Sequence, residues 1–444
     1  MIPSTIEAWR EALKAARDEG GEEKVYTTLR DKLMLITSNS KCQTPIFKAI
    51  VFGDLIILQL IDEFKCYNKD DTQFEGRNAL HMACSMIYKD ETKSAYVIKF
   101  LVNQLGFDLN CQDSKGLTPL HWAAKCCFEA VNVLIELGAN VHITTFTDGT
   151  PLLHGLSPIH YAMDEDIASA LITAGADVNT SSEFGTTPLH LACNLGREHV
   201  VRLLIKHEAC ISAKTKKNTT PLHLANNARV VKLLIYAGAC LEARDERGWT
   251  PLHCSSYYGL TRVVKELLRF DNDVDCKDKI YRSALHVANN PDIARLLLDE
   301  GADKDGESRR GNPIHCAIRS SRTEVVRVLL EEYNCDVNTK DKEGNSPLHL
   351  ASHSINDIFY CHVNDARIEI AKLLIANHPY FQLCDRNDKT AIEVCKREDP
   401  VFDLLFEAMK SQVSKAIDTR TEFYLSSAPV PGREGSCIRS TRED

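Results

Sequence analysis

The sequence predicts an all-α solenoid of stacked helical hairpins joined by short β-hairpin loops. Two observations support this fold class. A short helix-start motif recurs along most of the 444 residues, and each copy is followed by the apolar pattern of two short helices. A hairpin of this size cannot bury its own apolar face, so copies on both sides must cover it.

The clearest copy of the unit occupies residues 185–205. Thr187 can cap a helix N-terminus, and Pro188 falls at the first helical position, where a missing N–H costs nothing. Gly196 allows the chain to end this helix and turn. A second helix follows, and its apolar stripe consists of Val200, Val201, Leu203 and Leu204.

Nine units are marked by a histidine at the same motif position. The distances from His190 to His223 and from His253 to His286 are both 33 residues. Two further units begin at Thr44 and Thr390 and lack the histidine. The nine are His81, His121, His160, His190, His223, His253, His286, His315 and His349.

These features resemble the ankyrin-repeat family. The chain carries the Thr-Pro-Leu-His-x-Ala signature, the Gly-Ala-Asp-Val-Asn ending at 175–179 and a period close to the ~33 residues of that family. The resemblance covers residues 43 to about 400 and implies an ankyrin-repeat α-solenoid of about eleven repeats. We expect an N-terminal helical cap at 1–42, the array at 43–416 with a degenerate last repeat and a capping helix, and a flexible tail at 417–444.

The spacing between motif histidines alternates. The distances from His160 to His190 and from His223 to His253 are 30 residues, and the distance from His286 to His315 is 29. The missing residues fall between the two helices of a unit, and three residues are close to one helical turn. The units that begin near Pro158, Pro221 and Ala284 should therefore have a shortened first helix.

Irregular segments interrupt the array at two places, and helices lie at both of its ends. We expect two helices before residue 37, separated at Gly20–Gly21, with a capping box from Ser4 to Glu7. Residues 144–156 are predicted to form a lengthened finger, and 356–364 to be an insertion between two helices. A final helix at 400–415 should close the stack, followed by disorder after about residue 418.

Composition argues against several classes of function. The net charge is −9, with both signs interspersed, so no surface for nucleic acid or an anionic membrane is indicated. No apolar run approaches the ~20 residues of a membrane span, and the N-terminus lacks the apolar core of a secretory signal. The 17 cysteines are read as reduced thiols, which favours the cytoplasm or the nucleus. We expect a monomer.

No pattern of catalytic or metal-ligating residues emerges. Nine of the 16 histidines share one structural position, and Cys126-Cys127 lacks the spaced partners of a zinc site. No phosphate loop, nucleophile elbow or Cys/His nucleophile pair is present. We therefore predict no enzyme activity, no cofactor and no metal.

The resemblance implies that partners contact the positions which the repeat framework leaves free. In the family these are the loop before Thr-Pro and the pair after Ala-Ala, on the concave face. Trp, Tyr and Arg dominate binding hot spots. The candidate interaction residues are Phe184, Thr186, Asn194, Leu195, Glu246, Arg247, Trp249, Tyr257, Tyr258, Ile280, Tyr281 and Arg282, with Lys216 and Lys217 between them.

Alternatives remain open for these residues. Trp249 can pack on a neighbouring finger, with the tyrosines filling space left by the short units. Tyr281 stands where the family has glycine, which puts the geometry of that turn in question. Trp122 is read as groove wall or core. The resemblance further implies that Asn110, Asn179 and Asn338 can be substrates of an asparaginyl hydroxylase, although an ordinary turn role suffices.

The predicted function is that of a non-catalytic intracellular protein-binding scaffold or adaptor. One alternative is the substrate-receptor subunit of a ubiquitin ligase, but residues 428–431 offer only Ala-Pro-Val-Pro where such a tail requires a Leu-rich helix and a Leu-Pro-x-Pro-like segment. The other is a secreted ankyrin-type effector, which the absence of a signal sequence and the free-thiol pattern disfavour.

Overall fold

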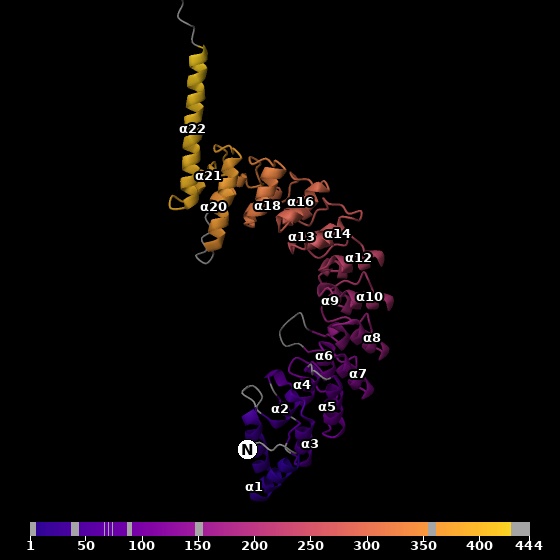
Figure 1. Ribbon diagram of the computed structural model, residues 1–444. Helices are drawn as coiled ribbons and strands as arrows, with labels where there is room; N and C mark the ends of the chain where they lie inside the picture. The colour runs from indigo at the N-terminus through magenta and orange to yellow at the C-terminus, as the bar shows by residue number, and fades with distance from the viewer. Residues whose placement is uncertain are drawn as a thin grey trace, which may run out of the picture. The chain divides into compact units, whose positions relative to one another are not determined.

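The computed structural model describes residues 6–36, 44–65, 67–69, 71–72, 74–86, 91–146, 154–353 and 361–427 (Figure 1). The chain divides into two compact units, Met1–Lys279 and Ile280–Asp444. We call them the N-terminal unit and the C-terminal unit and describe each by itself.

The N-terminal unit is a two-layered stack of helical hairpins. First helices such as α4, α6 and α9 contact the first helices of adjacent hairpins, and second helices such as α5, α7 and α10 contact second helices (Figure 1). The helices are α1 (Ile6–Ile36), α2 (Pro45–Phe52), α3 (Leu55–Glu63), η1 (Phe74–Gly76), α4 (Ala79–Ser85), α5 (Glu91–Asn103), α6 (Pro119–Ala124), α7 (Phe128–Glu136), η3 (Pro158–Tyr161), α8 (Glu165–Thr173), α9 (Pro188–Asn194), α10 (Glu198–Lys206), α11 (Pro221–Leu224), α12 (Ala228–Tyr236), α13 (Pro251–Tyr257) and α14 (Thr261–Leu267).

The C-terminal unit repeats the same layering and ends in a long helix. The helix α18 passes directly into a short π-helical segment, η4, and α20 packs against α22. Its helices are α15 (Ala284–Val287), α16 (Pro291–Asp299), α17 (Pro313–Arg319), α18 (Thr323–Arg327), η4 (Val328–Glu332), α19 (Pro347–Ser352), α20 (Cys361–Ala376), α21 (Ala391–Val394) and α22 (Pro400–Ser427).

The motif histidine joins its own helix to the finger loop of the next hairpin. In α9, the ring Nδ1 of His190 lies 2.8 Å from the Thr187 hydroxyl and accepts the Thr187 backbone N–H at 3.2 Å. The ring Nε2 donates to the Thr219 carbonyl at 3.0 Å. This ring is fully buried, and the structural interpretation of these histidines is confirmed.

The shortened first helices are also confirmed. The segments η3, α11 and α15 have four residues each, whereas α9, α13 and α17 have seven. After each short helix an Asp or Asn side chain caps the next helix at once. The capping residues Asp164, Asn227 and Asn290 accept from the backbone N–H three residues on, at 2.8–2.9 Å.

An arginine from the following hairpin occupies two of the places where a helical turn is missing. The guanidinium of Arg197 donates to the carbonyls of Ala162 (2.6 Å) and Tyr161 (3.3 Å). Arg322 donates to the Ala288 carbonyl at 2.8 Å. Carbonyls at a helix C-terminus lack intrahelical donors, so these arginines satisfy acceptors that the short helices leave open.

At the N-terminus the chain turns at the expected position, Gly20–Gly21, but no loop separates the two helical segments. The helix α1 is one element from Ile6 to Ile36, and Gly21 within it has a φ of 68°. The glycine therefore changes the chain direction without an intervening loop. Trp9, Leu13 and Leu29 of α1 are buried, and α1 contacts α2 and α3. Ser4 lies outside the described residues.

The last helix is longer than predicted. It runs from Pro400 to Ser427 rather than ending near residue 415, so the expected disorder after residue 418 is wrong for 418–427. Residues 416–427 contain no glycine or proline that would stop a helix, and Pro429 is the first such residue. The rest of the expected tail lies outside the described residues.

The finger loops are turns rather than strands. In the described part of the chain the backbone forms isolated bridges only, such as that between Ser308 and Gly311. The base of the predicted long finger is closed by the Thr145 N–H, which donates to the Leu156 carbonyl at 3.0 Å; residues 147–153 lie outside the described residues. Where the chain is described, no helix is both long and apolar enough to cross a membrane.

Candidate functional site

The framework leaves two kinds of position free in each hairpin, the finger tip and the residue that follows the two small residues of the first helix. We call the side formed by these positions the finger–helix surface. This second position holds Lys125, Asn194, Tyr257 and Arg319 in the four hairpins whose first helices are α6, α9, α13 and α17. The chemistry of this surface therefore varies while its backbone is constant.

The strongest aromatic cluster of the candidate set lies on α13 and the finger before it. Tyr257 and Tyr258 are 42% and 65% exposed, and their ring centroids are 5.3 Å apart. Trp249 is only 4% exposed, although its ring centroid lies 5.1 Å from that of Tyr257. Its indole N–H donates to the Asp278 carboxylate at 3.0 Å. Trp249 thus packs on the neighbouring finger, as the alternative interpretation held, and supports two exposed tyrosines.

The finger tip beside this cluster carries both charges. Glu246 and Arg247 are exposed, and the Arg247 guanidinium lies 5.4 Å from the centre of the Trp249 ring. Lys217 of the preceding finger is 3.8 Å from the Glu246 carboxylate. The structure therefore brings five of the candidate residues together in one patch of the N-terminal unit.

A second group of candidates lies on the α9 hairpin. Asn194 and Leu195 are exposed, whereas Phe184 and Thr186 are half-buried. The ammonium of Lys216 lies 5.4 Å from the centre of the Phe184 ring. This group offers one exposed apolar side chain, Leu195, on the same surface two hairpins before the tyrosines.

The remaining candidates, Ile280, Tyr281 and Arg282, belong to the C-terminal unit. Tyr281 has a φ of 65°, the left-handed conformation that Gly248 adopts at 79° in the preceding finger. The turn is therefore retained in spite of the tyrosine, which answers the question raised by the sequence. A non-glycine residue in this conformation costs about 1–2 kcal/mol. The Tyr281 side chain is 54% exposed.

The candidate set missed a cation–aromatic pocket in the N-terminal unit. Arg77 lies 3.8 Å from the Trp122 ring centre, and the Lys125 ammonium lies 4.2 Å from Trp122 and 4.5 Å from Tyr161. The pocket has a volume of about 340 Å³. Burial lowers the pKa of Lys125 to about 8. Trp122 thus forms part of a groove wall, as predicted, and Lys125 occupies the free position after Ala-Ala, a signal that had been applied only to other hairpins.

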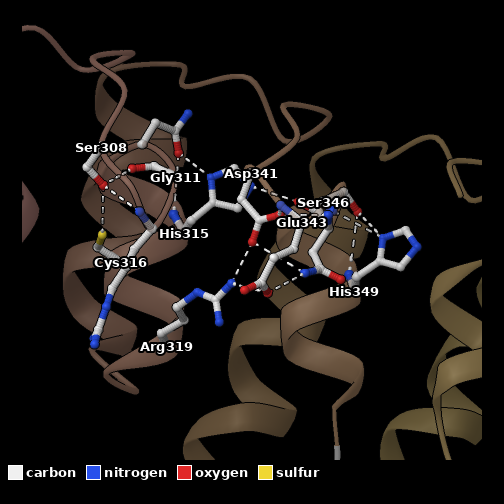
Figure 2. Close-up of polar contacts among 12 residues, drawn as sticks. Ser308, Gly311, His315, Cys316, Arg319, Asp341, Glu343, Ser346 and His349 are labelled. Carbon is white, nitrogen blue, oxygen red and sulfur yellow. Dashed lines mark hydrogen bonds and ion pairs between the residues drawn. The ribbon is translucent and has the colours of Figure 1, made fainter. Parts of the chain in front are cut away.

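A second missed group surrounds Arg319 in the C-terminal unit. Figure 2 shows Arg319 reaching Asp341 and Glu343, which belong to the finger before α19; its guanidinium is 2.5 Å and 3.5 Å from the two carboxylates. Asp341 also accepts the backbone N–H groups of Glu343 and Asn345. Burial acts to raise the pKa of Asp341, but these N–H groups and Arg319 outweigh it and lower the pKa below its usual value.

The three asparagines named for hydroxylation make contacts between hairpins. Each side-chain oxygen accepts a backbone N–H of the next unit: Asn110 from Asn140 (2.9 Å), Asn179 from Cys210 (2.7 Å) and Asn338 from Tyr380 (2.7 Å). This geometry supports a structural role. Their hydroxylation stays a prediction.

The cysteines that the structure describes give no sign of a chemical site. Burial raises the pKa of Cys254 to about 12, and Cys193, also buried, is shifted upward as well. Such thiols are protonated at neutral pH and behave as small apolar side chains. Within the described ranges, His, Cys, Asp and Glu side chains form no group that could hold a metal ion.

The hairpins, their finger loops and the free positions on one side define a repeat protein that interacts through its surface. A family model described as "Ankyrin repeats (3 copies)" matches five overlapping segments, 46–145, 85–181, 159–245, 225–308 and 289–360. These segments span more than half of the chain, which therefore belongs to the ankyrin-repeat family. Members of this family are, in general terms, protein-interaction modules.

Relatives in the family are similar over part of their length. The B-cell lymphoma 3 protein homolog of Mus musculus is 31% identical over 141 residues, which are 30% of this chain and 29% of that protein. The E3 ubiquitin-protein ligase KEG of Arabidopsis thaliana is 24% identical over 301 residues, 63% of this chain and 18% of that protein. Human neurogenic locus notch homolog protein 1 is 33% identical over 222 residues, which are 46% of this chain and 7% of that protein.

One solved structure is similar over part of the chain. The crystal structure of the ankyrin repeat domain of Bcl-3 is 27% identical and covers 50% of this chain and 99% of that one, with a TM-score of 0.41. The chain spans less than a third of the length of each of the three relatives above.

Proposed function

We propose that this chain is a non-catalytic protein-binding scaffold or adaptor that holds a partner on the finger–helix surface. The observation that carries the proposal is the pair of adjacent, exposed tyrosines at free positions of α13, Tyr257 and Tyr258. The framework does not require an aromatic side chain at either position, because the equivalent residues of the α9 hairpin are Asn194 and Leu195.

The tyrosine pair has the properties of a binding hot spot. Large aromatic side chains supply contact area at a low cost in side-chain entropy, and their hydroxyl groups can hydrogen-bond a partner. Trp249 beneath Tyr257 fixes the position of the patch, because its indole is bonded to Asp278. Arg247 and Glu246 provide a polar rim. A rigid aromatic centre with a charged rim favours a protein partner.

The proposal is tested by capture of partners from the native cell. Wild-type chain, the double variant Tyr257→Ser/Tyr258→Ser and the control Tyr236→Ser would be used as baits, with identification of the bound proteins by mass spectrometry. Tyr236 is 71% exposed on the second helix α12 and is not on the finger–helix surface. We expect the double variant to lose a partner that wild type and control retain, because removal of both rings should weaken the binding free energy by about 2 kcal/mol or more. Equal capture by all three baits would refute the tyrosine patch.

We further propose that the protein acts as a monomer in the cytoplasm or the nucleus. The free state of the described cysteines supports a reducing compartment and disfavours the secreted-effector alternative. The ubiquitin-ligase alternative receives no specific support. The KEG match covers 18% of that protein, and residues 428–431 lie outside the described part of the chain.

A further inference from the structure

A pocket of the C-terminal unit lies on its finger–helix surface. It has a volume of about 670 Å³, within the ~300–1,000 Å³ of ligand pockets. Its wall carries five cationic side chains, whereas its apolar part is formed by Ile318, Leu350 and Ile370. The cations are Arg309, Arg310, Arg319, Lys342 and Arg367.

Two of these cations are neutralised within the protein. Arg319 pairs with Asp341 and Glu343, and the buried Arg367 pairs with Asp399 at 2.5 Å. The other three form no ion pair with any carboxylate in the part of the chain that the structure describes. Arg309, Arg310 and Lys342 are exposed at the pocket rim, on two neighbouring fingers. The pocket therefore combines a fixed polar wall with free positive charge.

Tyr281, the residue with the left-handed backbone conformation, contacts two of the rim cations. The Arg309 guanidinium lies 5.7 Å and the Lys342 ammonium 6.0 Å from the centre of the Tyr281 ring. Glycine would hold the same turn without strain, as Gly248 does. The exposed Tyr281 ring lies beside two cations of the pocket rim and adds an aromatic surface next to them.

We propose that this basic pocket binds an acidic peptide segment of a partner protein, with an apolar side chain resting on Ile318, Leu350 and Ile370. The carboxylates of the segment pair with Arg309, Arg310 and Lys342 at the rim. This inference rests on the proposed function, since it takes the ligand to be part of a protein, and it assigns a site and a partner chemistry different from those of the tyrosine patch.

Both the charge and the apolar part of the pocket favour a peptide. The chain as a whole carries a net charge of −9, so an acidic segment is repelled by most of the molecule and attracted here. The isoleucine and leucine side chains suit a segment that carries an apolar residue better than a row of phosphates, which has no apolar side chain to offer. A nucleic-acid strand is the competing occupant.

Fluorescence anisotropy on the full chain provides the test. The probe is a fluorescein-labelled peptide of glutamates around a central leucine, compared with the same peptide carrying serine for leucine and with a labelled single-stranded DNA of equal charge. We expect the acidic peptide to bind wild type and the serine peptide to bind more weakly. The variant Arg310→Glu/Lys342→Glu should lose about tenfold in affinity.

The control variant is Lys372→Glu/Lys410→Glu, which makes the same change in net charge at exposed sites of the same unit outside the pocket. It should retain peptide binding. An absence of peptide binding to wild type, equal losses in both double variants, or DNA binding as tight as peptide binding would overturn the proposal. The Tyr257→Ser/Tyr258→Ser variant should bind the peptide normally, so failure at either site is distinguishable from failure at the other.

Discussion

The finger–helix surfaces of the two units share one backbone and differ in chemistry. At the equivalent position of the first helix, the N-terminal unit carries Tyr257 and the C-terminal unit carries Arg319. The tyrosine is supported by a buried indole, and the arginine is held by two carboxylates. The histidine framework is the same in both units, whereas the side chains at the free positions differ; under the proposed function these side chains determine which partner chemistry a unit accepts.

The largest expected difference between the two units is in how much stability each loses at acidic pH. Burial lowers the pKa of His121 to about 3 and of His160 and His190 to about 4, all in the N-terminal unit. The unfolded chain takes up protons near pH 6.5 and the folded chain does not, so stability falls as pH decreases from about 6.5 towards 4. Each of these histidines should contribute a loss of about 2 kcal/mol between pH 7 and pH 5.

Urea unfolding at pH 7 and pH 5 measures this effect. All three tryptophans lie in the N-terminal unit, so their fluorescence reports that unit, while far-UV circular dichroism reports both. We expect the fluorescence midpoint to shift more than the dichroism midpoint, because the dichroism also reports the C-terminal unit, in which His315 is a buried motif histidine with a lowered pKa. Identical shifts would remove the difference between the units.

The second expected effect is a difference in stability between variants of the buried Trp249 and variants of the exposed Tyr257 and Tyr258. Trp249→Ala should cost about 3 kcal/mol or more in the free energy of unfolding, because it empties a buried site and leaves Asp278 without the indole donor. Tyr257→Ser/Tyr258→Ser should cost less than about 1 kcal/mol, because both rings are exposed. Urea unfolding followed by circular dichroism gives both values. Similar losses would mean that the tyrosines are also structural.

The third effect concerns the arginines that complete the short helices, one in each unit. Arg197→Met and Arg322→Met should each cost about 1–3 kcal/mol, because the carbonyls of Ala162 and Ala288 then lose their donors. The control Arg202→Met removes an exposed pair with Glu198 and should cost less than about 0.5 kcal/mol. If Arg197 and Arg322 behaved like Arg202, the short hairpins would not depend on their neighbours.

The smallest effect should have the opposite sign. Tyr281→Gly is expected to stabilise the C-terminal unit by about 1 kcal/mol, because it relieves the left-handed conformation, and to weaken binding of the acidic peptide. Gly248→Ala, in the N-terminal unit, should destabilise, because its Cβ would meet the Lys279 nitrogen at 3.0 Å. Thermal unfolding of both variants, with peptide titration of the first, measures the contrast. A Tyr281→Gly variant that is destabilised would show that the ring contributes to the fold.

The repeat period and the motif predicted most of the fold from the sequence. Each hairpin is specified locally by a cap, a proline, a histidine and an apolar stripe, so the short helices at Pro158, Pro221 and Ala284 followed from spacing alone. The length of α22 did not follow, because the composition of the tail was weighed without the helix propensity of residues 416–427.

The sites were less accessible to sequence reasoning. The prediction used the free positions of the hairpins that are rich in aromatic residues. The same positions hold Lys125 and Arg319 in other hairpins, and these two residues line the two cationic pockets. The burial of Trp249 could not be read from its position, because the Asp278 that accepts its indole N–H is 29 residues away on the next finger.

The sequence by itself determined the family, the hairpin boundaries and the structural role of the histidines, because these depend on contacts within one repeat or between neighbouring repeats that share the same motif. Only the tertiary structure decided which free side chains are exposed, which arginines are already neutralised and where Tyr281 strains the backbone. Those properties depend on pairs of non-identical residues brought together by stacking, and no repeat pattern encodes them.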